Sequence, residues 1–377
     1  MDAPAIRPPR SVATIPPPPV TTPSPPPPPP TRTQPSRWSF FTEQILVRSR
    51  KFFLRECPWL QRYSPRWFQP DFTWPHRVLA TGQLSQEMPE IQPLTSTYWR
   101  PWIGQFHLLL CWLSEFYCAW YGHRYSSAIV PLPFGLILKW ADGTSFDEAR
   151  SMMAIRDAGF PCPKVISVGE HPRPSIWSPP PVSILMTRIP GDTLDEVYDS
   201  LGPTERSMIF AEISTMLETM RAWTNPWGQR ICSISGGPIR SIRVPNHRVE
   251  PCESEKEFHS YLLSAASPHS FQTSEEFNTA LELAKKLDDN HHRIVFTHGD
   301  LATHNIMVDG GHVSGFIDWE CAGWYPEYWE FTTPLRWPGR DPEGGGFFKR
   351  LGGRHYEKEL KSEMALVALT VDSWISF

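Results

Sequence analysis

The chain has 377 residues, a formal net charge of −4 at pH 7 and 42 prolines. Its length is sufficient for one large or two moderate domains with a buried core. Residues 1–70 carry ten Lys/Arg and three Asp/Glu, so the rest of the chain carries 26 basic and 37 acidic residues. Nucleic acids require a basic surface, and we therefore expect no nucleic-acid partner.

The seven cysteines are scattered along the chain and include no Cys-x-x-Cys pair. An odd number without paired spacing is typical of reduced thiols that pack as small apolar groups. We therefore predict a cytoplasmic protein with reduced cysteines.

Proline dominates the N-terminus, where residues 1–35 hold 15 of the 42 prolines. The runs Pro16–Pro19 and Pro25–Pro30 lack backbone N–H donors and have a fixed φ, which favours extended polyproline II and prevents a packed core. We predict a disordered tail over residues 1–37. Either this tail is simply solvated, or its arginine-flanked proline runs dock on an SH3 or profilin-like partner.

Residues 38–120 form an extension whose patterns do not assign it to a known unit. Residues 38–57 predict a basic amphipathic helix that either lies on a membrane surface or docks on its own domain. Phe106–Trp120 is apolar, but it is shorter than the roughly 20 residues of a membrane span and contains Glu115. We predict a buried helix packed against the next domain there, and no membrane association.

The next segment, residues 121–190, predicts a small β-rich lobe. The expected elements are a β-rich run over 132–140, a helix over 146–158, strands over 164–168 and 182–188, and a linker at 190–191. This order resembles that of the small lobe of a protein-kinase-like fold.

Lys139, near the end of the first strand run, has the properties of a phosphate contact. An ammonium group at a strand end is a fixed point charge that can hold phosphate oxygens. Glu148 is its candidate partner on the following helix, unless Glu148 completes a capping box with Ser145. No G-x-G-x-x-G precedes Lys139, so the hydroxyl and N–H groups of Ser126 and Ser127 are the candidates for covering the nucleotide phosphates.

Residues 191–377 predict a mainly helical second lobe. The expected helices lie over 203–223, 255–263, 275–289 and 356–374. The first has an apolar stripe of Ile209, Ile213, Met216 and Met220, and the last has a stripe of Leu360, Met364, Val367, Val371 and Trp374. Thr273 followed by Glu276 predicts a capping box.

Between these helices, the stretch from Thr297 to Glu330 concentrates polar residues suited to chemistry. Short strands are predicted over 293–296, 306–308 and 313–317, and the last two form a hairpin. The hairpin places Asn305 and Asp318 at the same end of two paired strands, and Asp300 precedes Asn305 by five residues, so the three side chains can converge. Turn formation alone explains the Asp309–Gly310 turn, but not these three residues.

The motif H-G-D-x-x-x-x-N followed by I-D-W-E resembles that of the aminoglycoside phosphotransferase and choline-kinase-like family. The segments LPFGLILK and YPEYWE are most similar to those of the fungal branch of aminoglycoside phosphotransferase-domain proteins. The resemblance covers about residues 121–330. It implies an α+β, bilobal protein-kinase-like fold with a small antiparallel β lobe and a mainly helical large lobe. It also implies ATP and Mg²⁺, and transfer of the γ-phosphoryl group to a hydroxyl of a small molecule.

Carried over residue by residue, the resemblance makes Asp300 the catalytic base beside the acceptor hydroxyl, and Asn305 and Asp318 the Mg²⁺ ligands. Mg²⁺ commonly takes one or two protein oxygens and completes its shell with phosphates and water. His298 is expected to hold the loop rather than shuttle a proton. The alternative to an active kinase is a pseudokinase-like module that binds nucleotide or a partner, which the missing glycine loop and the N-terminal extension favour.

Three further glutamates, Glu320, Glu327 and Glu330, follow Asp318. Either they form an anionic lip that attracts an amine-bearing substrate, or Glu330 hydrogen-bonds the catalytic loop and the other two are solvated.

Overall fold

The computed structural model of the protein describes residues 64–75, 84–174, 179–241, 243–244, 247–336 and 346–370. The proline-rich tail, its expected SH3 or profilin-like contacts and the expected helix over 38–57 lie outside these residues. The chain divides into two compact units, Met1–Arg48 and Ser49–Phe377, and every described residue belongs to the second unit.

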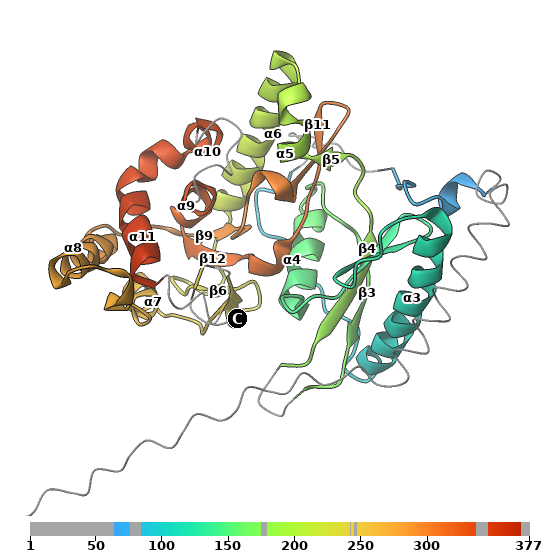
Figure 1. The fold of residues 1–377 in the computed structure, drawn as a ribbon, viewed down its shortest axis with the longest axis horizontal. Helices are drawn as coiled ribbons and strands as arrows, with labels where there is room; N and C mark the ends of the chain where they lie inside the picture. The colour runs from blue at the N-terminus through green and yellow to red at the C-terminus, as the bar shows by residue number, and fades with distance from the viewer. Residues whose placement is uncertain are drawn as a thin grey trace, which may run out of the picture. The chain divides into compact units, whose positions relative to one another are not determined.

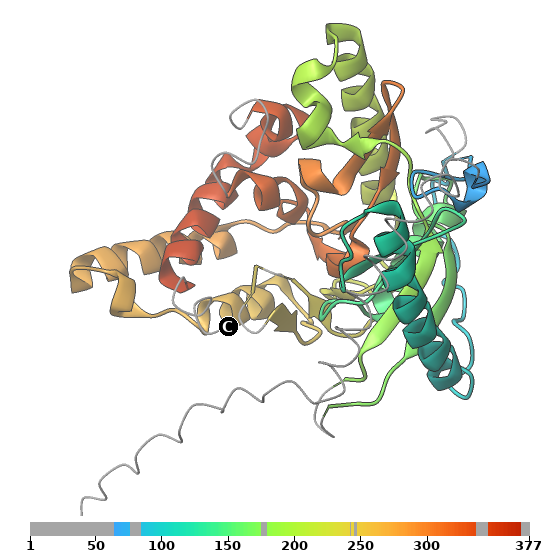
Figure 2. The same ribbon diagram turned by 45° about the vertical axis from the view of Figure 1, so that its right-hand side comes forward.

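The small lobe is an antiparallel sheet with a helix on each face (Figures 1 and 2). Its elements are η1 (Arg66–Phe68), α3 (Arg100–Tyr121), β1 (Ile129–Leu132), β2 (Leu136–Lys139), α4 (Phe146–Asp157), β3 (Val165–Glu170) and β4 (Val182–Thr187). The strand order is β1-β2-β4-β3, and each neighbouring pair is antiparallel. The expected small antiparallel lobe is confirmed.

The β-rich run expected over 132–140 contains the end of β1, a turn and the whole of β2. The chain turns between β1 and β2, where Phe134 and Gly135 have φ angles of 65° and 59°. A bulky residue rarely adopts a positive φ, and Phe134 is held there by stacking on Trp67, with ring centroids 5.1 Å apart. The turn therefore depends on a segment more than sixty residues upstream, which local sequence patterns do not reveal.

Helix α3 packs one side against the outer face of the sheet. At Gly104 an added Cβ would collide with the carbonyl oxygen of Glu170, so glycine permits the close approach of helix and strand. The buried His107 ring lies 2.7 Å from the hydroxyl of Ser183 and 2.9 Å from that of Ser167. Burial lowers the pKa of His107 to about 4, so this ring joins helix and sheet as a neutral group.

The other side of α3 is exposed, which the expectation of a buried helix did not anticipate. Its largest exposed side chains are Trp102, Phe106 and Trp112. Among the described residues, no helix has both the length and the apolar character needed to cross a membrane.

The large lobe is mainly helical and carries short strands at its centre (Figure 1). Its α-helices are α5 (Leu194–Val197), α6 (Pro203–Ala222), α7 (Glu255–Leu263), α8 (Ser274–Lys285), α9 (Trp329–Leu335), α10 (Gly346–Leu351) and α11 (Glu357–Thr370). Its strands are β5 (Asp192–Thr193), β6 (Cys232–Ser233), β7 (Ile239–Arg240), β8 (Arg248–Val249), β9 (Ile294–Thr297), β10 (Ile306–Asp309), β11 (His312–Phe316) and β12 (Gly323–Pro326). The expected α+β architecture is confirmed.

Apolar periodicity predicted α6 correctly, because the four residues of its expected stripe are all buried. The Thr273–Glu276 capping box at α8 is also present. The stripe expected for the last helix is wrong at Met364, which is 47% exposed, whereas Glu363 is buried. Val371 and Trp374 of that stripe lie outside the described residues. Glu363 forms an ion pair with Arg243, so a charged residue faces the interior of this lobe.

The two lobes are joined by a short connection that is tied to the large lobe on one side. Strand β5 pairs with β10 through Thr193 and Met307. Gly191 has a φ of 88°, and an added Cβ would collide with the carbonyl of Val308. The backbone after Pro190 is therefore packed directly against the hairpin formed by β10 and β11.

Candidate active site

The loop after β9 bends sharply at Gly299. This residue has a φ of 81°, and a Cβ at this position would collide with the carbonyl oxygen of Cys321. Only glycine allows the backbone to turn this close to the segment after β11. The bend brings the following residue, Asp300, to the end of the hairpin.

The hairpin brings Asn305 and Asp318 to one end, as expected. Ile317 N–H donates to the carbonyl of Asn305 at 3.0 Å, which places the residues before β10 and after β11 side by side. The Asn305 side-chain amide donates to the backbone carbonyl of Asp300 at 2.8 Å. Asp318 adopts the left-handed conformation with φ 65° and ψ 57°, an uncommon backbone that turns its carboxylate away from the strand direction.

Lys139 connects the small lobe to this hairpin. Its ammonium group lies 2.6 Å from Asp318 Oδ1, 2.8 Å from Glu148 Oε1 and 3.1 Å from Glu320 Oε2. Burial lowers the pKa of Lys139, but the three carboxylates outweigh that effect and leave the pKa raised. The lysine is therefore a fixed positive charge surrounded by an excess of negative charge.

Glu148 takes the pairing role rather than the capping role considered for it. Ser145 Oγ accepts the N–H of Glu148 at 3.1 Å, so Ser145 caps α4, but the Glu148 side chain bonds to Lys139. Glu148 is buried, which raises its pKa to about 7 against the attraction of Lys139. Three carboxylates share one ammonium group at this site. The most buried of them, that of Glu148, therefore binds a proton most readily.

His298 lies in the position of a loop support. Its Nε2–H donates to the carbonyl of Ile317 at 2.9 Å, and its ring contacts Trp319 with centroids 4.5 Å apart. Complete burial lowers the pKa of His298 to about 4. A neutral imidazole tied to the backbone is unsuited to proton shuttling at neutral pH.

The three glutamates after Asp318 do not form an anionic lip. Glu320 bridges Lys139 and Arg240, the latter at 3.1 Å, and Glu327 pairs with Arg221 at 3.3 Å. Glu330 Oε2 accepts the backbone N–H of His298 at 2.6 Å. The expected hydrogen bond from Glu330 to the catalytic loop is present, but the expectation that the other two are solvated is wrong.

Ser126 and Ser127 precede β1 in a segment without regular structure. Ser126 Oγ accepts the N–H of Ile129 at 3.3 Å, and Ser127 lines the cleft between the lobes. The structure therefore places Ser127 at the cleft and Ser126 at the start of the strand.

A cavity of about 920 Å³ lies in this cleft. The small lobe contributes Trp140 and Asp147, and the large lobe contributes Ser235, Arg240 and Glu320. Through Glu320 the cavity adjoins Lys139. A cavity lined by both polar and apolar groups beside an ion-paired lysine offers space and hydrogen-bonding groups for a ligand.

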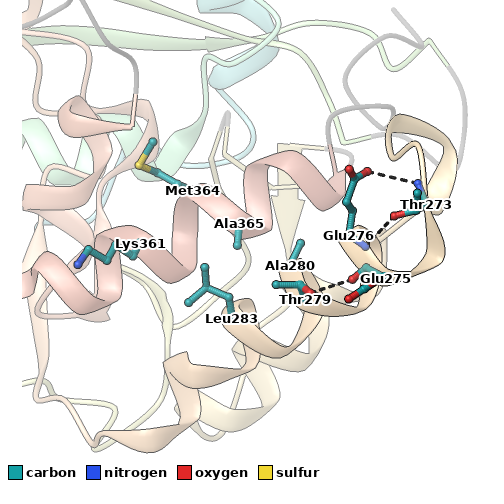
Figure 3. Close-up of a pocket in the computed structure, with 9 residues that line it drawn as sticks. All are labelled: Thr273, Glu275, Glu276, Thr279, Ala280, Leu283, Lys361, Met364 and Ala365. Atoms are coloured by element: carbon teal, nitrogen blue, oxygen red, sulfur yellow. Dashed lines mark hydrogen bonds between the residues drawn. The ribbon is translucent and has the colours of Figure 1, made fainter.

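A second hollow lies between α8 and α11, away from these residues (Figure 3). Its volume is about 830 Å³, and Figure 3 shows Thr273 and Glu276 at one end of it. Both residues are engaged in capping α8. The cleft, rather than this groove, contains the candidate chemistry.

The donor set at the hairpin suits Mg²⁺. Asn305 uses its amide nitrogen to hold Asp300, which leaves its amide oxygen for a cation, and Asp318 supplies a carboxylate that lies against the ammonium group of Lys139. The described residues contain no group of three or more His, Cys, Asp or Glu side chains arranged for a metal. Two oxygen ligands match the way Mg²⁺ binds together with phosphates.

Sequence reasoning missed three arginines near the site. Arg240 pairs with Glu320, Arg243 is buried against α9, and Arg336 is buried at the end of the same helix. None belongs to the motif, and Arg243 lies in a segment without periodicity. The one available signal was the unusual placement of Arg336 directly after an apolar helical run.

The sequence is similar to those of known phosphotransferases. The sequence model of the phosphotransferase enzyme family matches residues 122–366. An aminoglycoside 3'-phosphotransferase from Enterococcus faecalis is 25% identical over 216 residues, which are 53% of this chain and 70% of that protein.

Solved structures of aminoglycoside phosphotransferases are also similar. One is a thermostable mutant in a ternary complex with ADP and hygromycin B, 14% identical, covering 70% of this chain and 94% of that chain with a TM-score of 0.45. Another is an aminoglycoside-3'-phosphotransferase of type VIII, 18% identical, covering 65% and 91% with a TM-score of 0.41.

Proposed function

Because the chain belongs to the phosphotransferase enzyme family, we propose that it transfers the γ-phosphoryl group of ATP, with Mg²⁺, to a hydroxyl of a small molecule. The observation that carries this proposal is the 2.6 Å contact between Lys139 Nζ and Asp318 Oδ1, two residues far apart in the sequence. It joins a strand of the small lobe to the hairpin of the large lobe at the point where phosphates and a metal would meet.

In this proposal the small lobe holds the nucleotide. Lys139 contacts the phosphate oxygens, and Glu148 keeps its ammonium group in place at 2.8 Å. Ser126 and Ser127 cover the phosphates with hydroxyl and N–H groups in place of a glycine-rich loop. Glu320, now 3.1 Å from Lys139, is released toward Arg240 when the phosphates arrive.

The large lobe positions the acceptor. Asp300 accepts a hydrogen bond from the acceptor hydroxyl and takes its proton as the new P–O bond forms and the bond to the leaving ADP breaks. Asn305 and Asp318 would hold Mg²⁺, which supplies charge neutralisation on the phosphates when bound. His298 and Glu330 keep the loop that carries Asp300 in shape.

The acceptor in this proposal is a small hydroxyl compound. We further propose a reducing, cytoplasmic location, which the six described cysteines support because all six are buried.

The test is turnover of Mg·ATP against a panel of small hydroxyl compounds. We expect wild type to phosphorylate at least one of them, and Asp300→Asn to lower kcat by about 10²- to 10⁴-fold. Nucleotide binding should persist in that variant, because Asp300 contacts the acceptor rather than the phosphates. Thermal shift with Mg·ATP measures this independently.

Two outcomes would contradict the proposal. If Mg·ATP neither binds nor is consumed, the kinase assignment is wrong. If it binds with equal affinity to wild type and Asp300→Asn but no acceptor is ever phosphorylated by either, the chain is a nucleotide-binding module of the pseudokinase type.

A further inference from the structure

A small cavity lies where the sheet of the small lobe meets the connection between the lobes, and we call it the hinge cavity. Thr187 at the end of β4 lines it together with Arg188 and Ile189 of the connection. The turn before β2 contributes Phe134, and β2 itself contributes Leu136. The volume of about 420 Å³ is within the range of roughly 300–1,000 Å³ for small-molecule sites. Among the described residues, the hinge cavity shares no lining residue with the cleft cavity, so the two are separate.

The described lining of the hinge cavity is positively charged. It includes Arg156, Lys164 and Arg188 but no Asp or Glu. The lining also contains Pro75, and residues 76–83 that follow it in the sequence include no acidic residue. Beyond residue 70 the chain has 37 acidic and 26 basic residues, so this concentration of cations is contrary to its overall charge. A concave surface with one sign of charge attracts ligands of the opposite sign, which here means an anion.

Backbone hydrogen bonds hold the three cations around the same cavity. The N–H of Lys164 donates to Thr187 Oγ1 at 2.9 Å, and the N–H of Thr187 donates to the carbonyl of Lys164 at 3.0 Å. Lys164 therefore lies beside Arg188, the residue after Thr187. Arg156 Nη1 donates to the carbonyl of Cys162 at 2.6 Å, and Arg188 Nη1 also donates to a backbone carbonyl. A carbonyl is neutral, so these bonds fix the guanidinium groups without cancelling their charge.

Two aromatic side chains form exposed walls of the hinge cavity. Trp74 is 50% exposed and Phe134 is 43% exposed, although both are large and apolar. Trp74 Nε1–H donates to the backbone carbonyl of Phe134 at 2.7 Å, which fixes the indole beside the turn. Phe134 has a φ of 65°, and strained backbone of this kind is concentrated at ligand and active sites. The two fixed and exposed rings offer flat apolar surfaces on which an aromatic ligand can pack.

We propose that the hinge cavity binds an aromatic anion such as an aromatic carboxylate, with its ring on Trp74 and Phe134 and its anionic group among the three cations. Guanidinium and ammonium groups both donate charge-assisted hydrogen bonds to carboxylate oxygens. This site is separate from the phosphoryl-transfer residues and does not rest on the proposed function. Because Arg188 and Ile189 line the cavity, the ligand would contact the segment that joins the two lobes.

The first experiment compares a charged probe with its neutral analogue. Isothermal titration calorimetry measures binding of naphthalene-2-carboxylate and naphthalene-2-carboxamide to the full-length protein at constant ionic strength. We expect the carboxylate to bind at least about tenfold more tightly than the amide, because only the carboxylate can form charge-assisted bonds with the cations. Equal affinities, or no binding of the carboxylate at millimolar concentration, would overturn the proposal.

The second experiment removes one of the cations. Lys164→Met should lower the affinity for the naphthalene carboxylate about fivefold, since Lys164 is exposed and two arginines remain. Its affinity for the carboxamide should not change. Lys358→Met is the matched control, because Lys358 is an exposed lysine on α11, and it should leave both affinities unchanged. The same carboxylate affinity in wild type and both variants would contradict the proposed site.

The third experiment places a negative charge inside the cavity. Ile166 lines the hinge cavity and is 49% exposed, whereas Ile129 is 42% exposed on the same sheet and lies outside the described lining. Ile166→Glu should weaken binding of the carboxylate at least about tenfold through like-charge repulsion, and Ile129→Glu should leave it unchanged. Circular dichroism confirms that both variants fold. Equal weakening by both variants would show that the probe binds elsewhere.

Competition then separates the hinge cavity from the phosphoryl-transfer site. We expect the naphthalene carboxylate to remain bound in the presence of excess Mg·ATP, and its displacement would overturn the proposal. Decanoate replaces the aromatic ring by an acyl chain. Tighter binding of decanoate than of the naphthalene carboxylate would contradict the aromatic class of ligand. These measurements do not require turnover, so they decide the inference even if no acceptor is phosphorylated.

Discussion

The two ends of helix α9 differ in how their buried charges are bonded. At the first turn, Glu330 accepts the backbone N–H of His298, and Arg243 donates to the carbonyl of Trp329 and pairs with Glu363. At the last turn, Arg336 is also buried, and its Nε lacks a hydrogen-bond partner among the described residues. The first end therefore holds the catalytic loop and an ion pair, and we expect it to contribute more to stability than the second end.

The largest effect is expected from breaking the ion pair between Arg243 and Glu363 at the first end. Arg243→Met leaves the buried carboxylate of Glu363 without its counter-charge, which should lower the free energy of unfolding by about 4 kcal/mol. Chemical denaturation measures this, with the exposed Arg354→Met expected to change it by less than about 0.5 kcal/mol. The comparison fails if Arg243→Met and Arg336→Met have the same effect on stability.

A smaller loss is expected from the loop that Glu330 holds. Gly299→Ala would place a Cβ against the carbonyl of Cys321 at a φ of 81°, which should cost about 3 kcal/mol through strain and displacement of the loop. Gly310→Ala is the matched control, because φ is also positive there but no described atom lies within 4 Å. Its expected cost is about 1 kcal/mol. Thermal unfolding of the two variants separates the cost of the collision with Cys321 from the cost of backbone strain. Equal decreases in Tm for both variants would show that the collision costs nothing.

The smallest expected effect is the pH dependence of stability that comes from protonation of Glu330. Burial raises the pKa of Glu330 from 4.5 to about 7, although the N–H groups of His298, Gly299 and Leu301 oppose the shift. Between pH 4.5 and 7 the folded protein therefore binds more protons at Glu330 than the unfolded chain does. Its contribution to stability is then greatest at low pH and decreases as the pH rises toward 7.

Glu330→Gln isolates this contribution from those of other titrating groups. The free energy of unfolding of wild type minus that of the variant should fall by roughly 2 kcal/mol from pH 4.5 to 7, since one unit of pKa corresponds to about 1.36 kcal/mol. Urea denaturation at a series of pH values measures the difference. A difference that does not change with pH would show that Glu330 keeps its ordinary pKa.

The sequence predicted the parts that depend on local patterns. Apolar spacing located α6, and hairpin signals located the strands that bring Asn305 toward Asp318. The pairing of Lys139 with Glu148 followed from the order of strand and helix. These features require only residues close in sequence or a motif with fixed spacing.

The remainder depends on contacts between distant segments. Phe134 turns because Trp67 stacks on it, and Glu363 is buried because Arg243 reaches it from more than a hundred residues away. An apolar pattern cannot reveal a buried ion pair, so the face of α11 was misplaced.

The connection between the lobes has a mechanical consequence. Arg188 N–H donates to the carbonyl of Gly135, which ties the small-lobe side, and β5 pairs with β10 on the other side. Ile189, Pro190 and Gly191 lie between these anchors, and proline allows little rotation about φ. Any rocking of the small lobe is thus transmitted through β5 to the strand that follows Asn305. Opening of the cleft is then coupled to displacement of the hairpin through three residues.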